Sequence, residues 1–497
     1  MSETVNMANN RFFTTFSIFA SIILISSCLG SATVQQKTHT FAVENDTQNT
    51  VKLLSPLSSF PIFVEQNGNF TITFESANFD QLFASISTAY EPVVDEFWLD
   101  IENTWKTGST WYALALIPPD TPPELYNLTL VIQRNGAFFS CSQPRAVNII
   151  TGFSTNFTFI HVTDLHIGDP RGFRENIRET IGYKSVKKCI DEINLLHPDF
   201  VIISGDLVFG QLYPFEYTRE YKQCFELLQL FDVPTFLCPG NHDGYYKLGQ
   251  DGLEFWKHYF GPLYYSFDYG TYHFAALNSY DWPPYMRRAL WFITLNWGGY
   301  ISDDQLQWIE EDLTHASANL TFMFLHHNPL WDTTTDSLLR QAYHNRHELL
   351  ALIDEYNVDM VLAGHVHFDN VTVVNDTVFL TTTTPESDIQ TDDGYWGYRR
   401  IQIQSGNIVS YNYKDPKYSI PSYHLTYRFH NPYTAIVEND LEENITASLK
   451  FLVPLGNYSV QNGSIIQQRE NTYQTEIYVV AEVEKQNSVI VTLTPSS

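Results

Sequence analysis

Residues 157–166 read F-T-F-I-H-V-T-D-L-H, an apolar run rich in aromatic and β-branched residues that ends in Asp164 and His166. A short apolar run of this kind is typical of a buried strand. Four later runs, F-V-I-I-S, P-T-F-L-C, L-T-F-M-F-L and V-D-M-V-L-A, alternate with helical stretches such as 186–196 and 221–231. This alternation predicts a mixed α/β domain in the middle of the chain.

Each of these predicted strands ends in a cluster of polar residues. The later clusters are Gly205-Asp206, Gly240-Asn241-His242-Asp243, His326-His327 and Gly364-His365-Val366-His367. In an open α/β sheet, ligands bind at the carboxyl ends of the strands, so we expect the five clusters to gather at one edge. The glycines beside Asp206, Asn241 and His365 allow the backbone to approach closely there.

The Asp, His and Asn side chains in these clusters can bind metal ions. A single D-x-H or H-x-H is weak evidence, but five ordered clusters together indicate a metal centre. A mixed set of Asp, His and Asn donors is borderline in softness and suits Mn²⁺, Fe²⁺/³⁺ or Zn²⁺ better than Ca²⁺. Two such ions about 4 Å apart can activate a shared water and clamp phosphoryl oxygens.

In this order the clusters resemble the motifs D-x-H, G-D, G-N-H-(D/E), H and G-H-x-H of the calcineurin-like metallophosphoesterase superfamily. The resemblance covers roughly residues 157–412 and implies a four-layer αββα sandwich that holds two metal ions. It implies that the first metal is bound by Asp164, His166 and His367, the second by Asn241, His326 and His365, and that Asp206 bridges both.

The same resemblance gives roles to His242 and Asp243. His242 would be the general acid that protonates the leaving group, and Asp243 would orient it. Because the family's ligand directly follows the apolar strand, His326 matches better than His327, which would line the rim of the site. Purple acid phosphatases carry a tyrosine ligand three residues after the bridging Asp, where this chain has Phe209.

An aromatic insertion spans residues 281–300 and reads D-W-P-P-Y-M-R-R-A-L-W-F-I-T-L-N-W-G-G-Y. Its composition favours a lid in which Arg287 or Arg288 meets a phosphate and Trp282 or Tyr285 stacks on a base or glycan. The alternative, that these residues pack on a neighbouring domain, stays open. A Ser302–Gln305 capping box after the insertion predicts a helix whose buried face carries residues 306, 309 and 313.

The flanking segments change in character. Residues 31–60 are polar and predict a tether. Residues 61–155 show short alternating runs that predict a β-sandwich, and the catalytic domain follows at residues 156–415. Alternating runs return at residues 424–497, where they predict a second β-sandwich.

The amino terminus points to export. Residues 12–30 are uncharged and rich in Phe and Ile, so residues 1–30 predict a signal peptide or a membrane anchor. Ile25-Ser26-Ser27-Cys28 resembles a lipobox, in which Cys28 would be lipidated. Ten N-x-S/T sequons support an exported, glycosylated protein: Asn45, Asn69, Asn127, Asn156, Asn319, Asn370, Asn375, Asn444, Asn457 and Asn462. The four remaining cysteines permit disulfides, although a buried free thiol is the preferred state for Cys238.

The net charge of the chain limits the kinds of partner that it can bind. The 28 basic and 56 acidic residues give a net charge of −28, which argues against a nucleic-acid partner. We therefore expect an exported, membrane-tethered phosphoesterase that acts on phosphomono- or phosphodiesters, with nucleotide-type small molecules favoured. The alternatives are a phospholipid or sphingolipid phosphodiesterase and a surface binding or scaffolding protein with a structural metal site.

Overall fold

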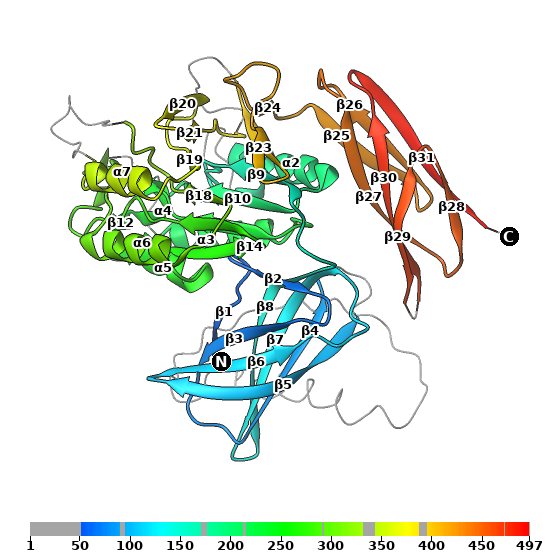
Figure 1. The fold of residues 1–497 in the computed structure, drawn as a ribbon, viewed down its shortest axis with the longest axis horizontal. Helices are drawn as coiled ribbons and strands as arrows, with labels where there is room; N and C mark the ends of the chain where they lie inside the picture. Colours follow the sequence, from blue (N-terminus) through cyan, green and yellow to red (C-terminus); the bar gives the residue numbers. More distant parts are fainter. Residues whose placement is uncertain are drawn as a thin grey trace, which may run out of the picture. The chain divides into compact units, whose positions relative to one another are not determined.

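A computed structural model describes residues 51–89, 95–169, 176–211, 215–290, 293–331, 343–386, 395–471 and 473–496 (Figure 1). The predicted signal segment or anchor, Cys28 and residues 31–50 of the predicted tether lie outside these ranges, so their roles stay predictions. Within the ranges, no helix is both long and apolar enough to cross a membrane.

The first described part is an eight-stranded sheet with the order β1-β3-β6-β5-β4-β7-β8-β2. Burial along β3 alternates, with Phe70, Ile72 and Phe74 inside, as a half-buried strand requires. The strands are β1 (Lys52–Ser55), β2 (Ile62–Glu65), β3 (Asn69–Glu75), β4 (Gln81–Thr88), β5 (Glu96–Thr107), β6 (Thr110–Leu116), β7 (Glu124–Arg134) and β8 (Ala137–Ile150). The assignment of this sheet as a β-sandwich stays a prediction.

The sheet begins earlier than the sequence predicted. β1 lies inside the range predicted as tether and pairs with β3. Val51, Leu53 and Leu57 are buried in the core of this sheet, which explains why the segment is ordered into a strand. The predicted tether therefore ends before residue 51.

The middle of the chain contains two sheets. The first has the order β11-β10-β9-β22-β23, with β24 paired to β22, and the second has the order β14-β15-β18-β19-β21-β20. The first comprises β9 (Asn156–Val162), β10 (Phe200–Ser204), β11 (Thr235–Cys238), β22 (Gly397–Gln404), β23 (Asn407–Ser410) and β24 (Ile420–Pro421). The second comprises β14 (Tyr265–Tyr269), β15 (Tyr272–Ala276), β18 (Leu320–Phe324), β19 (Met360–Ala363), β20 (Asn370–Val374) and β21 (Thr377–Thr381). β24 extends this domain beyond the predicted boundary at residue 415.

Aromatic side chains join the two sheets face to face. The Phe159 ring lies 5.6 Å from that of Phe274 and 5.5 Å from that of Phe322. The alternate residues of β9, Ile160 and Val162, belong to a different apolar cluster. The central strands are thus buried on both faces, which explains their nearly continuous apolar sequences.

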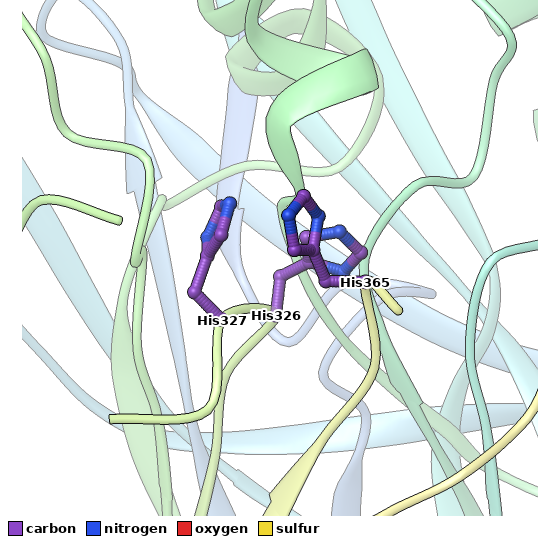
Figure 2. Close-up of side chains that lie close together, drawn as sticks. All are labelled: His326, His327 and His365. Carbon is purple, nitrogen blue, oxygen red and sulfur yellow. The ribbon is translucent and has the colours of Figure 1, made fainter. Parts of the chain in front are cut away.

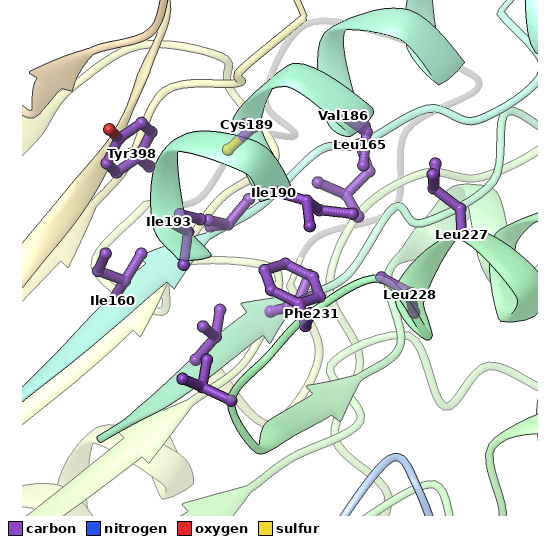
Figure 3. Packing of buried hydrophobic residues seen from close by; sticks show 14 of the residues in the cluster. Ile160, Leu165, Val186, Cys189, Ile190, Ile193, Leu227, Leu228, Phe231 and Tyr398 are labelled. Atoms are coloured by element: carbon purple, nitrogen blue, oxygen red, sulfur yellow. The ribbon is translucent and has the colours of Figure 1, made fainter. Parts of the chain in front are cut away.

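Helices cover the outer faces of both sheets. Helix α2 (Ile181–Leu196) packs Val186, Cys189, Ile190 and Ile193 in one cluster with Ile160 of β9 (Figure 3). On the second sheet, helices α6 (Asp303–His315) and α7 (Arg346–Glu355) share a cluster with residues of β15, β18 and β19. The other helices are η1 (Ile177–Glu179), α3 (Tyr217–Leu228), α4 (Asn241–Gly244) and α5 (Gly252–Tyr259). The result is a mixed α/β fold layered helix, sheet, sheet, helix.

Small hairpins and a carboxyl-terminal pair of sheets complete the described fold. The hairpins pair β12 (Tyr246–Lys247) with β13 (Gln250–Asp251) and β16 (Ala289–Leu290) with β17 (Ile293–Thr294). The carboxyl-terminal sheets have the orders β25-β26-β31-β28 and β27-β30-β29. Their strands are β25 (Leu425–Asn431), β26 (Thr434–Asn439), β27 (Ile445–Val453), β28 (Tyr458–Gln461), β29 (Ser464–Glu470), β30 (Thr475–Val483) and β31 (Asn487–Pro495). As at the other end, the name β-sandwich stays a prediction.

Of the two hydrogen bonds predicted for the Ser302–Gln305 capping box, the structure contains one. Ser302 Oγ accepts from the Gln305 amide at 3.3 Å, as expected of an N-cap. The Gln305 side chain does not reach back to the cap. It accepts from the Asn278 amide and donates to the Asn278 carbonyl, both at 2.9 Å, because both groups are buried and need partners.

Each of the four described cysteines, at 141, 189, 224 and 238, is a free thiol. Burial raises the pKa of Cys238 well above its ordinary value. The preference for a buried thiol at Cys238 is therefore confirmed in the structure.

Arg399 is a buried cation of the middle domain. Its side chain is fully buried, and it donates to Asp369 Oδ1 at 2.7 Å, Asn412 Oδ1 at 2.6 Å and the carbonyl oxygens of Thr381, Tyr411 and Lys417. Arg399→Met leaves the buried Asp369 carboxylate without its cation, so we expect a loss of about 3–5 kcal/mol in unfolding free energy. Urea denaturation followed by circular dichroism measures the change.

Arg428 offers a matched control. Its guanidinium lies 3.8 Å from Glu438, and both side chains are well exposed. Arg428→Met should change the free energy of unfolding by less than about 1 kcal/mol. Equal losses in both variants would contradict the role of the Arg399 network.

His273 makes the stability of the second sheet depend on pH. Burial acts to lower its pKa, but hydrogen bonds to Asp268 and Asp312, at 2.8 and 2.9 Å, raise the pKa to about 9. A raised folded-state pKa contributes stability below pH 6.5 that is lost as the pH rises towards 9. We expect wild-type protein to lose up to about 2 kcal/mol over this window, and His273→Gln to lose less. Thermal melts at pH 6, 7.5 and 9 compare the two proteins, and parallel curves would contradict this account.

Candidate metal centre

The five polar clusters follow strands of both sheets. Asp164 and His166 follow β9, Asp206 follows β10, and Asn241 opens α4 just after β11. From the second sheet, His326 follows β18, while His365 and His367 follow β19. Their donor atoms form four groups within 4.8 Å, among them Asp164 with His166 and His367, and Asp164 with Asp206 and His326. The structure thus brings residues of all five clusters to one site.

Asp206 lies at the centre of the site. Its Oδ2 is 3.0 Å from His326 Nε2, 3.6 Å from His166 Nε2 and 3.9 Å from His242 Nε2. Its Oδ1 accepts from the His242 amide at 2.8 Å. A carboxylate between histidines of different strands has the position expected of a bridging ligand.

Asp164 is oriented by its second carboxylate oxygen. Oδ2 accepts from the Thr163 hydroxyl and the His365 amide, both at 2.9 Å. Oδ1 has no hydrogen-bond partner among the described residues and lies 3.3 Å from His367 Nε2. One oxygen is therefore fixed by the protein and the other faces the site.

Asn241 and His326 likewise have one polar atom held by the protein and another that faces the site. Asn241 Nδ2 donates to the Tyr245 hydroxyl at 2.6 Å, which leaves Oδ1 without a partner in the described structure. His326 Nδ1 lies 2.8 Å from the Ser204 carbonyl, which leaves Nε2 facing the site. Buried polar atoms without partners are costly, and a cation would satisfy them. The donor set therefore fits a metal centre built from oxygen and imidazole ligands.

The backbone carries strain at these positions. Five of the predicted ligands have positive φ, namely Asp164 (57°), His166 (43°), Asp206 (53°), His365 (76°) and His367 (57°). Non-glycine residues rarely adopt this region, and such strain gathers at functional sites where the surrounding structure enforces it. The glycines 205 and 364 beside them are required by contact, since a Cβ at Gly205 would lie 2.6 Å from the Gly240 nitrogen and one at Gly364 would lie 1.9 Å from Thr163 Oγ1.

The adjacent histidines His326 and His327 both lie near His365 (Figure 2), and the three form one of the candidate metal-binding groups. The His327 ring lies 4.4 Å from that of His365, but both of its nitrogens are engaged. Nδ1 lies 2.9 Å from the Ser279 hydroxyl and Nε2 lies 2.8 Å from the Trp297 carbonyl. Burial, followed by the neighbouring His326, lowers the pKa of His327 to about 3, so it lines the site as a neutral ring.

His242 reaches the site from the amino end of α4. Its Nδ1 contacts the Phe209 carbonyl, and its Nε2 points towards Asp206. Burial lowers the pKa of His242 to about 4, so in the free protein the ring is neutral and Nε2 is an acceptor. The Phe209 ring lies 5.6 Å from the His242 ring, so the residue that replaces the tyrosine of purple acid phosphatases packs beside this histidine.

The expectation that Asp243 orients the His242 ring needs correction. The Asp243 carboxylate accepts from the amides of Leu207, Val208 and Gly240, at 2.9, 3.1 and 2.8 Å. It therefore fixes the turn that carries Asp206 and the Phe209 carbonyl, and it acts on His242 only through the backbone. Burial, together with the nearby Asp206, raises the pKa of Asp243 to about 7.

The histidines also set the charge of the two central carboxylates. Burial acts to raise the pKa values of Asp164 and Asp206, but neighbouring histidines lower both below the ordinary value. For Asp164 these are His367 and His326, and for Asp206 they are His326 and His242. Both groups are therefore carboxylates at neutral pH, the form that binds a cation.

The aromatic insertion divides between anchored and exposed residues. Arg287 is buried and pairs with Asp251 at 2.6 Å, and it also donates to the Trp282 carbonyl. Trp282 is itself buried, and its Nε1 donates a hydrogen bond to the Gly298 carbonyl at 2.7 Å. These contacts correct the expectation that Arg287 and Trp282 face substrate. Arg288 and Tyr285 are exposed, and their contact with substrate stays a prediction.

Two supporting residues were not singled out from the sequence. Tyr245 orients the Asn241 amide from four residues along the chain, a helical spacing that could have pointed to it. Thr384 Oγ1 donates to the Asp164 carbonyl at 2.7 Å across 220 residues, and no local pattern signals such a contact.

Comparisons with known proteins agree with this site. The calcineurin-like phosphoesterase family matches residues 157–369. A protein of Arcobacter nitrofigilis named "Probable glycerophosphodiester phosphodiesterase GpdQ" is 27% identical over 47% of this chain and 80% of its own length. A 3',5'-cyclic-nucleotide phosphodiesterase of Nostoc is 28% identical over 41% of this chain and 70% of its own length.

Among solved structures, GAP50, the anchor in the inner membrane complex of Plasmodium, is similar at 13% identity over 54% of this chain and 90% of its own, with a TM-score of 0.34. Residues 157–369 thus match the calcineurin-like phosphoesterase family and carry clustered donors that could bind metal ions, and the chain is a hydrolase that acts on phosphoric ester bonds.

Proposed function

We propose that this protein hydrolyses small phosphodiesters, and more slowly phosphomonoesters, with nucleotide-type molecules among its preferred substrates. The observation that carries the proposal is the convergence of donors from five segments around Asp206, with His242 Nε2 3.9 Å from its carboxylate. A purely structural metal site needs neither a partly exposed histidine nor unpartnered donors. The names of the two relatives, a glycerophosphodiester and a cyclic-nucleotide phosphodiesterase, support diesters.

Two metal ions, of Mn, Fe or Zn type, would supply an activated water and neutralise charge on the phosphoryl oxygens. Asp164, His166 and His367 would hold one ion and Asn241, His326 and His365 the other, with Asp206 shared. The negative charge of a bound phosphoryl group beside His242 favours a proton on Nε2. His242 then gives that proton to the leaving oxygen as the P–O bond breaks.

A substrate panel tests the proposal. Purified protein with defined Mn²⁺ is assayed on p-nitrophenyl phosphate, its bis ester, cyclic nucleotides and glycerophosphodiesters. We expect the highest kcat/KM on diesters of small alcohols or nucleosides, and metal-free protein should be inactive. Higher kcat/KM on every monoester than on its diester counterpart would overturn the diester preference.

A lipid phosphodiesterase is the second candidate, because apolar residues are exposed along the aromatic insertion. Tyr285, Leu290, Ile293, Leu295 and Trp297 are between 39% and 63% exposed. Trp297 also belongs to the site wall, since its carbonyl contacts His327. Hydrolysis of phospholipid in liposomes at a rate above that of the water-soluble diesters would favour this candidate.

We further propose that the protein is exported and tethered to a membrane through residues 1–30, and that it is glycosylated. Of nine sequon asparagines in the described residues, seven are exposed, which supports the last point: Asn69, Asn156, Asn319, Asn375, Asn444, Asn457 and Asn462. Membrane fractionation of wild-type protein and of Cys28→Ala tests the lipobox. Recovery of wild-type protein in the soluble cell interior would overturn export.

A further inference from the structure

A buried carboxylate lies behind one of the predicted ligands. Glu386 is fully buried, and its Oε2 lies 3.5 Å from Nδ1 of His166. The opposite nitrogen of the same ring, Nε2, faces Asp206 at 3.6 Å. The His166 ring therefore stands between a carboxylate outside the ligand set and the centre of the site.

The segment that carries Glu386 is fixed to the first cluster. Thr384 Oγ1 donates to the Asp164 carbonyl at 2.7 Å and accepts from the Glu386 amide at 3.0 Å. The Thr384 carbonyl accepts from the Gly397 amide at 3.0 Å, which ties the segment to β22. One short stretch thus supports the backbone of Asp164 and the ring of His166, the two donors of the D-x-H motif.

A second link joins this stretch to the last cluster. Thr383 Oγ1 donates to the His367 carbonyl at 2.9 Å, and the Thr383 amide donates to Asp369 at 3.1 Å. Because Asp369 is held by Arg399, the position of the stretch is set by the buried ion pair described above. Glu386 is therefore placed by the fold and does not depend on a mobile surface side chain.

Chemistry gives a reason for a carboxylate at this position. A histidine that binds a metal through Nε2 carries its proton on Nδ1 and needs an acceptor for it. A carboxylate acceptor fixes the tautomer and the ring orientation, and it makes Nε2 a stronger donor to the metal.

We propose that Glu386 is a positioning residue for the metal centre: it accepts a hydrogen bond from His166 Nδ1 and directs Nε2 towards the first metal ion. The inference rests on the proposed ligand set but not on the substrate. Glu386 touches neither substrate nor metal in this arrangement, and its effect is on metal affinity.

The test measures Mn²⁺ binding in the absence of substrate. We expect Glu386→Ala to raise the Kd for Mn²⁺ at one of the two sites by 10- to 100-fold. Glu386→Gln keeps an acceptor oxygen of the same reach, so we expect a smaller rise of about 2- to 10-fold. Isothermal titration of metal-free protein gives both values, and Glu386→Gln also serves if the alanine variant does not fold.

Glu192 is the matched control. It is also buried, and it accepts from the Tyr398 hydroxyl at 3.1 Å on α2, away from the clusters. Glu192→Gln should leave the Kd for Mn²⁺ unchanged, whatever it does to thermal stability. Wild-type Mn²⁺ affinity in every folded Glu386 variant would overturn the proposal. If wild-type protein binds Mn²⁺ and hydrolyses none of the esters, the proposed function fails while this test still stands.

Discussion

Asp206→Asn is expected to lower kcat/KM on phosphodiesters by about 1,000-fold or more, the largest effect of any single change in this protein. The carboxylate lies within 3.9 Å of three histidine Nε2 atoms, on His326, His166 and His242. An amide of the same shape removes the negative charge that two metal ions would share. We therefore expect metal content, measured by elemental analysis after gel filtration, to fall together with activity.

Asp191 is a suitable control for this substitution. It lies on the exposed surface of α2, paired with Lys187 at 3.1 Å. Asp191→Asn should keep full activity and metal content. Undiminished hydrolysis by Asp206→Asn would overturn the assignment of Asp206 as the bridging ligand. Loss of activity with full metal content would show that Asp206 acts in catalysis and is not needed to bind the metal ions.

The position of the site could be predicted because the signals are local. Each apolar strand and the polar cluster after it occupy adjacent positions, and the carboxyl ends of strands in such a sheet face one edge. Asp164, Asp206 and His326 are reached in this way, whereas the choice of His326 over His327 comes from the family resemblance and stays a prediction. The glycines 205, 240 and 364 also appear in the sequence beside the donors they allow to approach.

Contacts between distant segments could not be predicted. The hydrogen bond from Thr384 to Asp164 joins residues 220 positions apart, and Glu386 reaches His166 over a similar separation. Asp243 illustrates the same limit, since its residue type and place in the motif are right but its partners are backbone amides of another strand end. Composition also cannot tell a buried arginine from a free one, as Arg287 shows by pairing with Asp251.

The net charge of −28 is compatible with the proposed phosphate-ester substrate, because two of the acids, Asp164 and Asp206, would bind the metal ions. Asp164 and Asp206 face histidines and, by the proposed assignment, cations, so their charge is neutralised where the substrate binds. The remaining acidic surface disfavours long polyanions, whose binding requires many cationic contacts. The charge therefore supports the prediction that long nucleic acids do not bind, and it is compatible with the proposed small phosphate esters.

His242→Ala is expected to lower kcat by about 100- to 10,000-fold on diesters with an alkyl leaving group, without loss of metal. Its ring is not needed to hold the centre, since its Nδ1 contacts the Phe209 carbonyl and its backbone amide, which the substitution keeps, binds Asp206. The loss should come from the leaving oxygen, which departs without a proton in the variant.

Comparing substrates with different leaving groups tests whether His242 acts as a general acid or only orients the substrate. p-Nitrophenol is far more acidic than an aliphatic alcohol, so its anion departs readily without protonation. We expect His242→Ala to reduce kcat on bis(p-nitrophenyl) phosphate by only about 10-fold, well below its effect on a glycerophosphodiester. If His242 only positions the substrate, the same substitution reduces both rates by the same factor, and that result would remove its assignment as the acid. Because the metal content is equal in both assays, a difference between the two factors reports proton transfer from this one ring.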